Sequence, residues 1–191
     1  MAGRPATDWR EKFGKVFRGD YHTGGEDGSC IMGIELTAND VIALAEQIEK
    51  AACNFYARAA KAVGDRRTRQ LLSELAALEQ VHEDIFSGLR LGKETLPARI
   101  EAAAGPISAE VGMLARGLEE TLGEVAASQS SAEMLRRALA FEQDSVKFFQ
   151  GMRKMLPRGA AQKRVDAIIE EEVSHVLMIS SALNWHGQAD A

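Results

Sequence analysis

Apolar residues recur at steps of three and four positions along four segments of the chain, which is the periodicity of an amphipathic α-helix. The pattern predicts helices over residues 37 to about 63, 65 to about 92, 130 to 156 and from 160 toward 185. The second segment places Leu71, Leu75 and Leu78 on one face, and the fourth places Val165 and Ile168 on one face. Together with a composition rich in alanine and leucine, these segments predict an all-α domain.

Capping signals mark the ends of these segments. Thr37 is followed by Asp40 and Ser130 by Glu133, each at the spacing of a capping box, which predicts a helix start at both places. A Gly-Asp pair interrupts the pattern after the first helix, and Pro157 interrupts it after the third. The first and second helices, and again the third and fourth, are therefore joined by only a few residues.

The connections predict how the four helices are arranged. Short connections make each pair an antiparallel hairpin, whereas residues 92–129 are long enough to travel the length of a bundle and contain a short helical candidate at 108–127. Two hairpins joined by one long crossover form the ferritin-like four-helix arrangement. The expected organisation is a four-helix domain over residues 37–191, preceded by an extension, residues 1–36, with a short amphipathic segment and a glycine-rich loop.

The charge and cysteine content limit the partners and the cellular compartment that are expected for this protein. The net charge is −5 with a pI near 5.5, and the basic residues are scattered, so neither a nucleic-acid partner nor a membrane is expected. The N-terminal residues show no secretory leader pattern, so a cytoplasmic protein is expected. Cys30 and Cys53 make no Cys-x-x-Cys pair, which excludes a rubredoxin-type or zinc-ribbon site within this sequence.

The candidate chemistry is duplicated. One constant shift along the sequence maps a Glu and a following Glu-x-x-His motif in the first hairpin onto the same set in the second. A single Glu-x-x-His occurs on many helices by chance, but a repeated set in the same order and spacing predicts a shared function. The six residues are Glu49, Glu79, His82, Glu142, Glu172 and His175.

This residue set favours a dinuclear metal site. Four carboxylates buried together without a counter-charge would repel one another or take up protons, and two divalent cations would balance them. Carboxylates with one imidazole for each ion suit iron or manganese, whereas structural zinc favours thiolates. Glu46, Glu83 and Glu171 flank the set and are interpreted as solvated or outer groups, and Cys53 as a small core residue or a neighbour of the metal site.

The sequence around these positions resembles the rubrerythrin-type ferritin-like domains. Residues 45–56 and 78–83 are similar to the first half of such a domain, and residues 141–149 and 171–175 to the second, so that the resemblance covers residues 37–186. It implies that the six residues are metal ligands and that Tyr56 donates a hydrogen bond to a ligand carboxylate. Two departures stand out, because a rubredoxin domain is missing and Ser145 stands where rubrerythrins carry an additional redox-switching Glu.

The resemblance implies two iron ions, with manganese or a mixed pair as alternatives, in an oxidoreductase that reduces peroxide or dioxygen. An external electron donor and a homodimer are also expected. Three alternatives remain open. They are a ferritin-like protein that oxidises iron for storage or delivery, a small di-iron hydroxylase, and a helical binding module in which metal only holds the fold.

Overall fold

The computed structural model describes residues 38–91, 130–156 and 158–189. These residues form four helices and no strand, which confirms the all-α prediction. The helices are α2 (Ala38–Ala62), α3 (Arg66–Leu91), α5 (Ser131–Met155) and α6 (Ala160–Ala189). The predicted N-terminal segment, the Thr37 cap and the helical candidate at 108–127 lie outside the described residues. None of the described helices combines the length and the hydropathy needed to cross a membrane.

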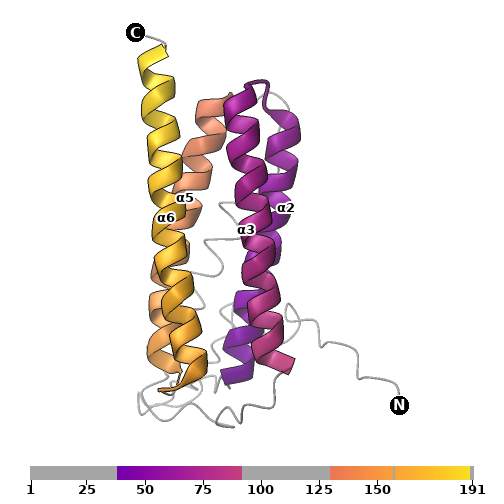
Figure 1. Ribbon diagram of the computed structural model, residues 1–191, viewed down its shortest axis with the longest axis vertical. Helices are drawn as coiled ribbons and strands as arrows, with labels where there is room; N and C mark the ends of the chain where they lie inside the picture. Colours follow the sequence, from indigo (N-terminus) through magenta and orange to yellow (C-terminus); the bar gives the residue numbers. More distant parts are fainter. Residues whose placement is uncertain (1–37, 92–129, 157, 190–191) are drawn as a thin grey trace, which may run out of the picture.

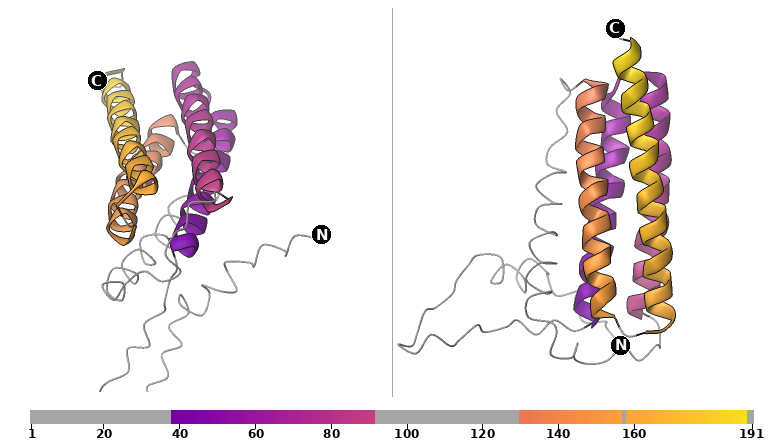
Figure 2. Two further views of the ribbon diagram at one scale, coloured as in Figure 1. Left: turned by 60° about the horizontal axis from the view of Figure 1, so that its bottom comes forward. Right: turned by 90° about the vertical axis from the view of Figure 1, so that its left-hand side faces the viewer.

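The four helices pack as two antiparallel hairpins that lie face to face (Figures 1 and 2). Helix α2 pairs with α3, and α5 with α6. Across the interface between the hairpins, α3 meets α6 and α2 meets α5. Helix α3 ends at one end of the bundle, and α5 begins at the opposite end (Figure 1). This arrangement confirms the predicted ferritin-like fold.

Local hydrogen bonds explain where two of the helices begin. The Ser130 side chain accepts from the backbone N–H of Glu133, and the Glu133 carboxylate accepts from the backbone N–H of Ser130, so the predicted capping box is present. At the start of α3, the backbone N–H of Thr68 donates to Asp65 Oδ2 at 2.6 Å. Hydrogen bonds from the Thr68 side chain and backbone lower the pKa of Asp65. Both caps satisfy amide groups that the first turn leaves without partners.

The core between the hairpins is built from aromatic and aliphatic side chains. Phe86 of α3 stacks on Phe149 of α5 with ring centroids 5.4 Å apart, and Tyr56 of α2 meets Phe141 of α5 edge to face at 6.3 Å. Each fully buried side chain of this size stabilises the fold by about 1.5–3 kcal/mol relative to an exposed one. These contacts pack the two hairpins together on either side of the polar residues described below.

One part of the predicted core face was wrong. Leu78 is 37% exposed, because the neighbouring inward positions of α3 are taken by Glu79 and His82. Val81 is also exposed on α3, as are Val173 and Leu177 on α6. The two helices thus present apolar side chains outward next to the polar residues that they bury.

Candidate metal centre

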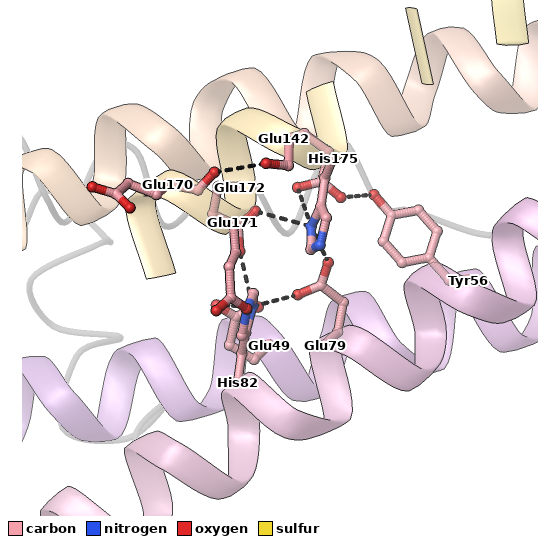
Figure 3. A network of polar contacts seen from close by, with 10 residues as sticks. Glu49, Tyr56, Glu79, His82, Glu142, Glu170, Glu171, Glu172 and His175 are labelled. Atoms are coloured by element: carbon pink, nitrogen blue, oxygen red, sulfur yellow. Dashed lines mark hydrogen bonds and ion pairs between the residues drawn. The ribbon is translucent and has the colours of Figure 1, made fainter. Parts of the chain in front are cut away.

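All four helices contribute acidic or histidine side chains to the middle of the bundle (Figure 3). Helices α2 and α5 each contribute one Glu, and α3 and α6 each contribute a Glu and a His one helical turn apart. At most 1% of each residue is exposed to solvent. The structure therefore brings together every residue of the duplicated set, namely Glu49, Glu79, His82, Glu142, Glu172 and His175.

The six residues form two overlapping groups that could each hold a metal ion. One group consists of Glu49, Glu79, His82 and Glu172, and the other of Glu79, Glu142, Glu172 and His175. Within each group, one potential ligand atom from every residue lies within 4.8 Å of the others. Glu79 and Glu172 belong to both groups, whereas each group has one histidine and one further Glu of its own.

The histidines face this cluster through the same ring atom. His82 Nδ1 lies 3.1 Å from Glu79 Oε2 and 3.0 Å from Glu172 Oε1, and His175 Nδ1 lies 3.1 Å from Glu79 Oε1. The two imidazole rings stack with centroids 5.6 Å apart and an interplanar angle of 24°. Each imidazole therefore presents one nitrogen to the carboxylates that the two groups share.

Several buried ligand atoms in the cluster have no partner with hydrogen-bond geometry within the described part of the chain, although some of them lie within ion-pair distance of another cluster residue. A buried polar atom without a partner costs about 1–3 kcal/mol, so such atoms are rare and need an explanation. A pair of bound cations supplies one, because each orphaned atom would then coordinate a metal ion. The residues present thus fit a dinuclear metal site. The atoms are Glu49 Oε1, Glu79 Oε1, Glu142 Oε2, both carboxylate oxygens of Glu172, and His175 Nδ1.

The pKa values of the cluster carboxylates are shifted because four acids are buried close together. Burial and the nearby carboxylates of Glu79 and Glu172 raise the pKa of Glu49 well above its usual range. Burial and Glu172 raise the pKa of Glu142 to about 8. Burial also acts to raise the pKa of Glu172, but its polar interactions with Glu142 and the two histidines outweigh it and lower that pKa. In the absence of a cation, Glu49 and Glu142 therefore hold their protons more tightly than Glu172 does.

The pKa values of both histidines are also raised, because the nearby carboxylates stabilise the charged imidazolium. Burial acts to lower the pKa of His82, but hydrogen bonds to Glu172 and Glu79 outweigh it and raise the pKa to about 10. Burial likewise opposes protonation of His175, while the nearby carboxylates of Glu142 and Glu172 raise its pKa to about 12. Protons on the imidazoles thus compensate the carboxylates in the metal-free protein. A metal ion that binds here has to displace them, as ligand nitrogens must be deprotonated.

Tyr56 lies beside the cluster and contacts it directly. Its side chain is fully buried, and its hydroxyl donates to Glu142 Oε1 (Figure 3). Burial and the neighbouring Glu142 carboxylate raise the pKa of the phenol well above its usual value, so it remains protonated as a donor. This is the contact with a cluster carboxylate that the sequence resemblance implied.

Three residues that flank the cluster in sequence lie outside the two ligand groups. Glu46 pairs with Arg90, and Glu83 pairs with Lys50, so both are surface ion pairs. Cys53 is partly exposed and contacts Gln80 across 3.8 Å, outside both groups, and burial raises the pKa of its thiol.

Glu171 contacts the cluster although it is half exposed, because His82 Nε2 donates to Glu171 Oε2 at 2.8 Å. No local sequence pattern predicts this particular contact, since it joins α6 to α3. Ser145 is buried on the same face of α5 as Glu142, and its hydroxyl finds no partner among the described residues.

Comparisons with known proteins agree with this fold and site. A family model described as rubrerythrin matches residues 27–90, which include α2, nearly all of α3, and the residues Glu49, Glu79 and His82. The chain is also similar to a solved structure from Thermotoga maritima, described as that of a candidate ferritin-like diiron-carboxylate protein. The two share 19% identity with a TM-score of 0.60, over 78% of this chain and 96% of the other. No curated protein matches the chain.

Fold and site together define a ferritin-like four-helix protein with a buried carboxylate and histidine cluster that could bind metal. The family model confirms the resemblance to rubrerythrins over residues 27–90, and the solved structure confirms the ferritin-like fold over most of the chain.

Proposed function

We propose that this protein holds two iron ions in the candidate metal centre and uses them to reduce peroxide or dioxygen. The observation that carries the proposal is the pair of overlapping ligand groups, each with three carboxylates and one imidazole and all completely buried. Carboxylate and imidazole donors without thiolate suit iron or manganese better than structural zinc. Glu79 and Glu172 would contact both ions, while His82 and His175 would each contact one.

Bound iron would supply electrons, one from each Fe(II). Reduction of one hydrogen peroxide to two waters consumes two electrons and two protons, so a two-iron centre matches one peroxide, whereas one dioxygen takes four electrons to water. The protein's part is to hold the ligands apart from bulk water and to position hydrogen-bond donors. Phe141 is fully buried against the ring of Tyr56, and the Tyr56 hydroxyl holds the Glu142 carboxylate in place. These contacts give a dry and preorganised site.

The residues of this sequence offer no evident group that would supply electrons for a second turnover. The 191-residue sequence contains no Cys-x-x-Cys pair, and Cys53 makes no contact with any of the six cluster residues among the described contacts. We propose an external electron donor, and a homodimer in the cytoplasm as the working state. Native mass spectrometry tests the dimer directly.

An anaerobic titration with Fe(II), followed by stopped-flow mixing with peroxide and then with dioxygen, tests the function. The expected result is uptake of two Fe(II) per chain and a rapid optical change on mixing with at least one oxidant. Glu79→Ala should lose this change, while Glu74→Ala, an exposed acid on the same helix, should keep it.

The same experiment separates the alternatives. Oxidation and retention of many more than two iron ions per chain, together with a large shell-like assembly, would favour storage. Two bound ions that react with neither oxidant would leave a structural metal site and overturn the oxidoreductase proposal.

A further inference from the structure

Glu171 on α6 contacts a cluster histidine from the outer side. His82 Nε2 donates to Glu171 Oε2 at 2.8 Å, while the Glu171 side chain remains 51% exposed. Figure 3 shows the Glu171 side chain extending toward His82, which belongs to α3. The two ring nitrogens of His82 therefore have separate partners, with Nδ1 facing the cluster carboxylates and Nε2 facing Glu171.

This hydrogen bond has a defined consequence for a ligand histidine. A carboxylate that accepts from one ring nitrogen fixes the proton there, holds the ring in orientation, and makes the other nitrogen a stronger donor to a metal. In His82 the nitrogen left available is Nδ1, which already points at Glu79 and Glu172. Glu171 thus prepares His82 for metal binding without being a ligand itself.

The other half of the duplicated site lacks this contact. The shift that maps His82 onto His175 maps Leu78 onto Glu171, so an apolar residue stands where the second imidazole would need its acid. Within the described part of the chain, no carboxylate contacts His175 Nε2; its ion pairs all run through Nδ1. The two groups have equal numbers of carboxylates and imidazoles, so their difference arises from residues around them.

We infer that Glu171 is a positioning residue for His82 that makes the metal site containing His82 bind its ion more tightly than the site containing His175. The two ions therefore bind in order, the His82 site first. The inference rests on the proposed function only in requiring that the cluster binds two metal ions, and it does not depend on which oxidant the protein uses.

A titration of the metal-free full-length protein with Co(II), followed by calorimetry and by the visible absorption of the bound ion, tests the order of binding. The wild type should show two binding events of different affinity. Glu171→Leu, which copies the residue of the other half, should weaken the tighter event by about 10–100-fold and leave the weaker one unchanged. Glu171→Gln, which keeps an acceptor but removes the charge, should give a smaller loss.

Two further variants separate this role from general effects. Glu170→Gln removes the same charge from the preceding exposed position of α6 and should leave both affinities unchanged. Leu78→Glu places an acid at the equivalent position on α3 and should tighten the weaker event. Circular dichroism and thermal unfolding check that each variant is folded, which the exposure of both altered side chains favours.

The outcomes distinguish failure of the inference from failure of the proposed function. If the wild type binds no Co(II), the metal centre itself is overturned. If the wild type binds two ions but with indistinguishable affinities, or if Glu171→Leu changes neither affinity, only the role of Glu171 is overturned. The same holds if Glu170→Gln weakens the tighter event as much as Glu171→Leu does.

Discussion

Tyr56 of α2 donates its hydroxyl proton to the Glu142 carboxylate of α5, and this hydrogen bond joins the two hairpins inside the candidate metal centre. The shift that relates the two halves maps Tyr56 onto Phe149, which has no hydroxyl to offer Glu49. The pair Tyr56–Glu142 is therefore a second difference between the two halves of a site whose six cluster residues are matched.

Replacing Tyr56 with Phe should leave metal uptake at two ions per chain and slow the oxidation of the reduced centre by about 10-fold or more. In the metal-free protein, loss of the donor leaves a buried carboxylate oxygen unpaired and should cost about 1–3 kcal/mol in the free energy of unfolding. Metal analysis, stopped-flow absorption and denaturant unfolding measure the three effects.

Phe55→Leu is the matched control, because the Phe55 ring contacts Tyr56 at 5.3 Å but makes no hydrogen bond to the cluster. It should lower stability without changing the oxidation rate. An equal loss of rate in both variants would contradict a specific role for the phenol.

The overlap of the two ligand groups makes distinct predictions for single substitutions. Glu79→Ala or Glu172→Ala removes a residue that both groups share, and each variant should therefore lose at least one metal ion and weaken the other. Glu49→Ala and Glu142→Ala each remove a residue that only one group uses, so one ion should remain. Metal analysis after dialysis measures the stoichiometry, and Glu74→Ala provides the control. Two ions retained in Glu79→Ala would contradict the dinuclear model.

The sequence predicted the helices to within a residue or two where local signals define their ends. Ser130 and Glu133 form the expected capping box, and α5 begins at the next residue. The repeated Glu-x-x-His motif likewise predicted which side chains would meet. A Glu and a His three residues apart lie on the same face of a helix, and the apolar residues on that face indicate that it points into the bundle.

Contacts between helices that are far apart in sequence could not be predicted in the same way. The sequence left open whether Glu171 is a solvated acid or an outer group of the site, and only the packing of α3 against α6 brings it to His82. The exposure of Leu78 was missed for a related reason. A prediction from periodicity assumes that apolar residues point inward. On this part of α3 the inward positions are occupied by polar residues, so the Leu78 side chain lies toward solvent.

The metal-free protein should become less stable as the pH rises from about 5 to 8. Native His82 and His175 have pKa values of about 10 and about 12, against 6.5 for an ordinary histidine, so their contribution is complete below pH 6.5 and is lost as the pH rises through the native values. Native Glu142, with a pKa of about 8 against 4.5, also holds a proton that the unfolded chain releases. Because the native state binds more protons, the free energy of unfolding falls with pH.

Glu172 opposes this trend, since its lowered pKa gives a contribution that is present above pH 4.5 and lost in acid. Within the metal-loaded protein, cations replace the protons, so stability should depend less on pH and should be higher throughout. Thermal midpoints of both forms at pH 6, 7 and 8 test this. Parallel pH profiles for the two forms would contradict proton compensation within the cluster.

Oxidation of the reduced protein by peroxide should stop after one turnover unless an electron donor is added. Each chain is expected to hold two Fe(II), which is enough to reduce one peroxide to water, and the described contacts of Cys53 connect it only to Gln80. Ser145 also stands where rubrerythrins carry a further Glu, so the centre lacks that additional carboxylate. Peroxide consumption should therefore equal one per chain without a donor, and should continue when a reductant such as a reduced redox dye is supplied. Sustained consumption without any donor, in protein stripped of excess iron, would contradict the need for an external donor.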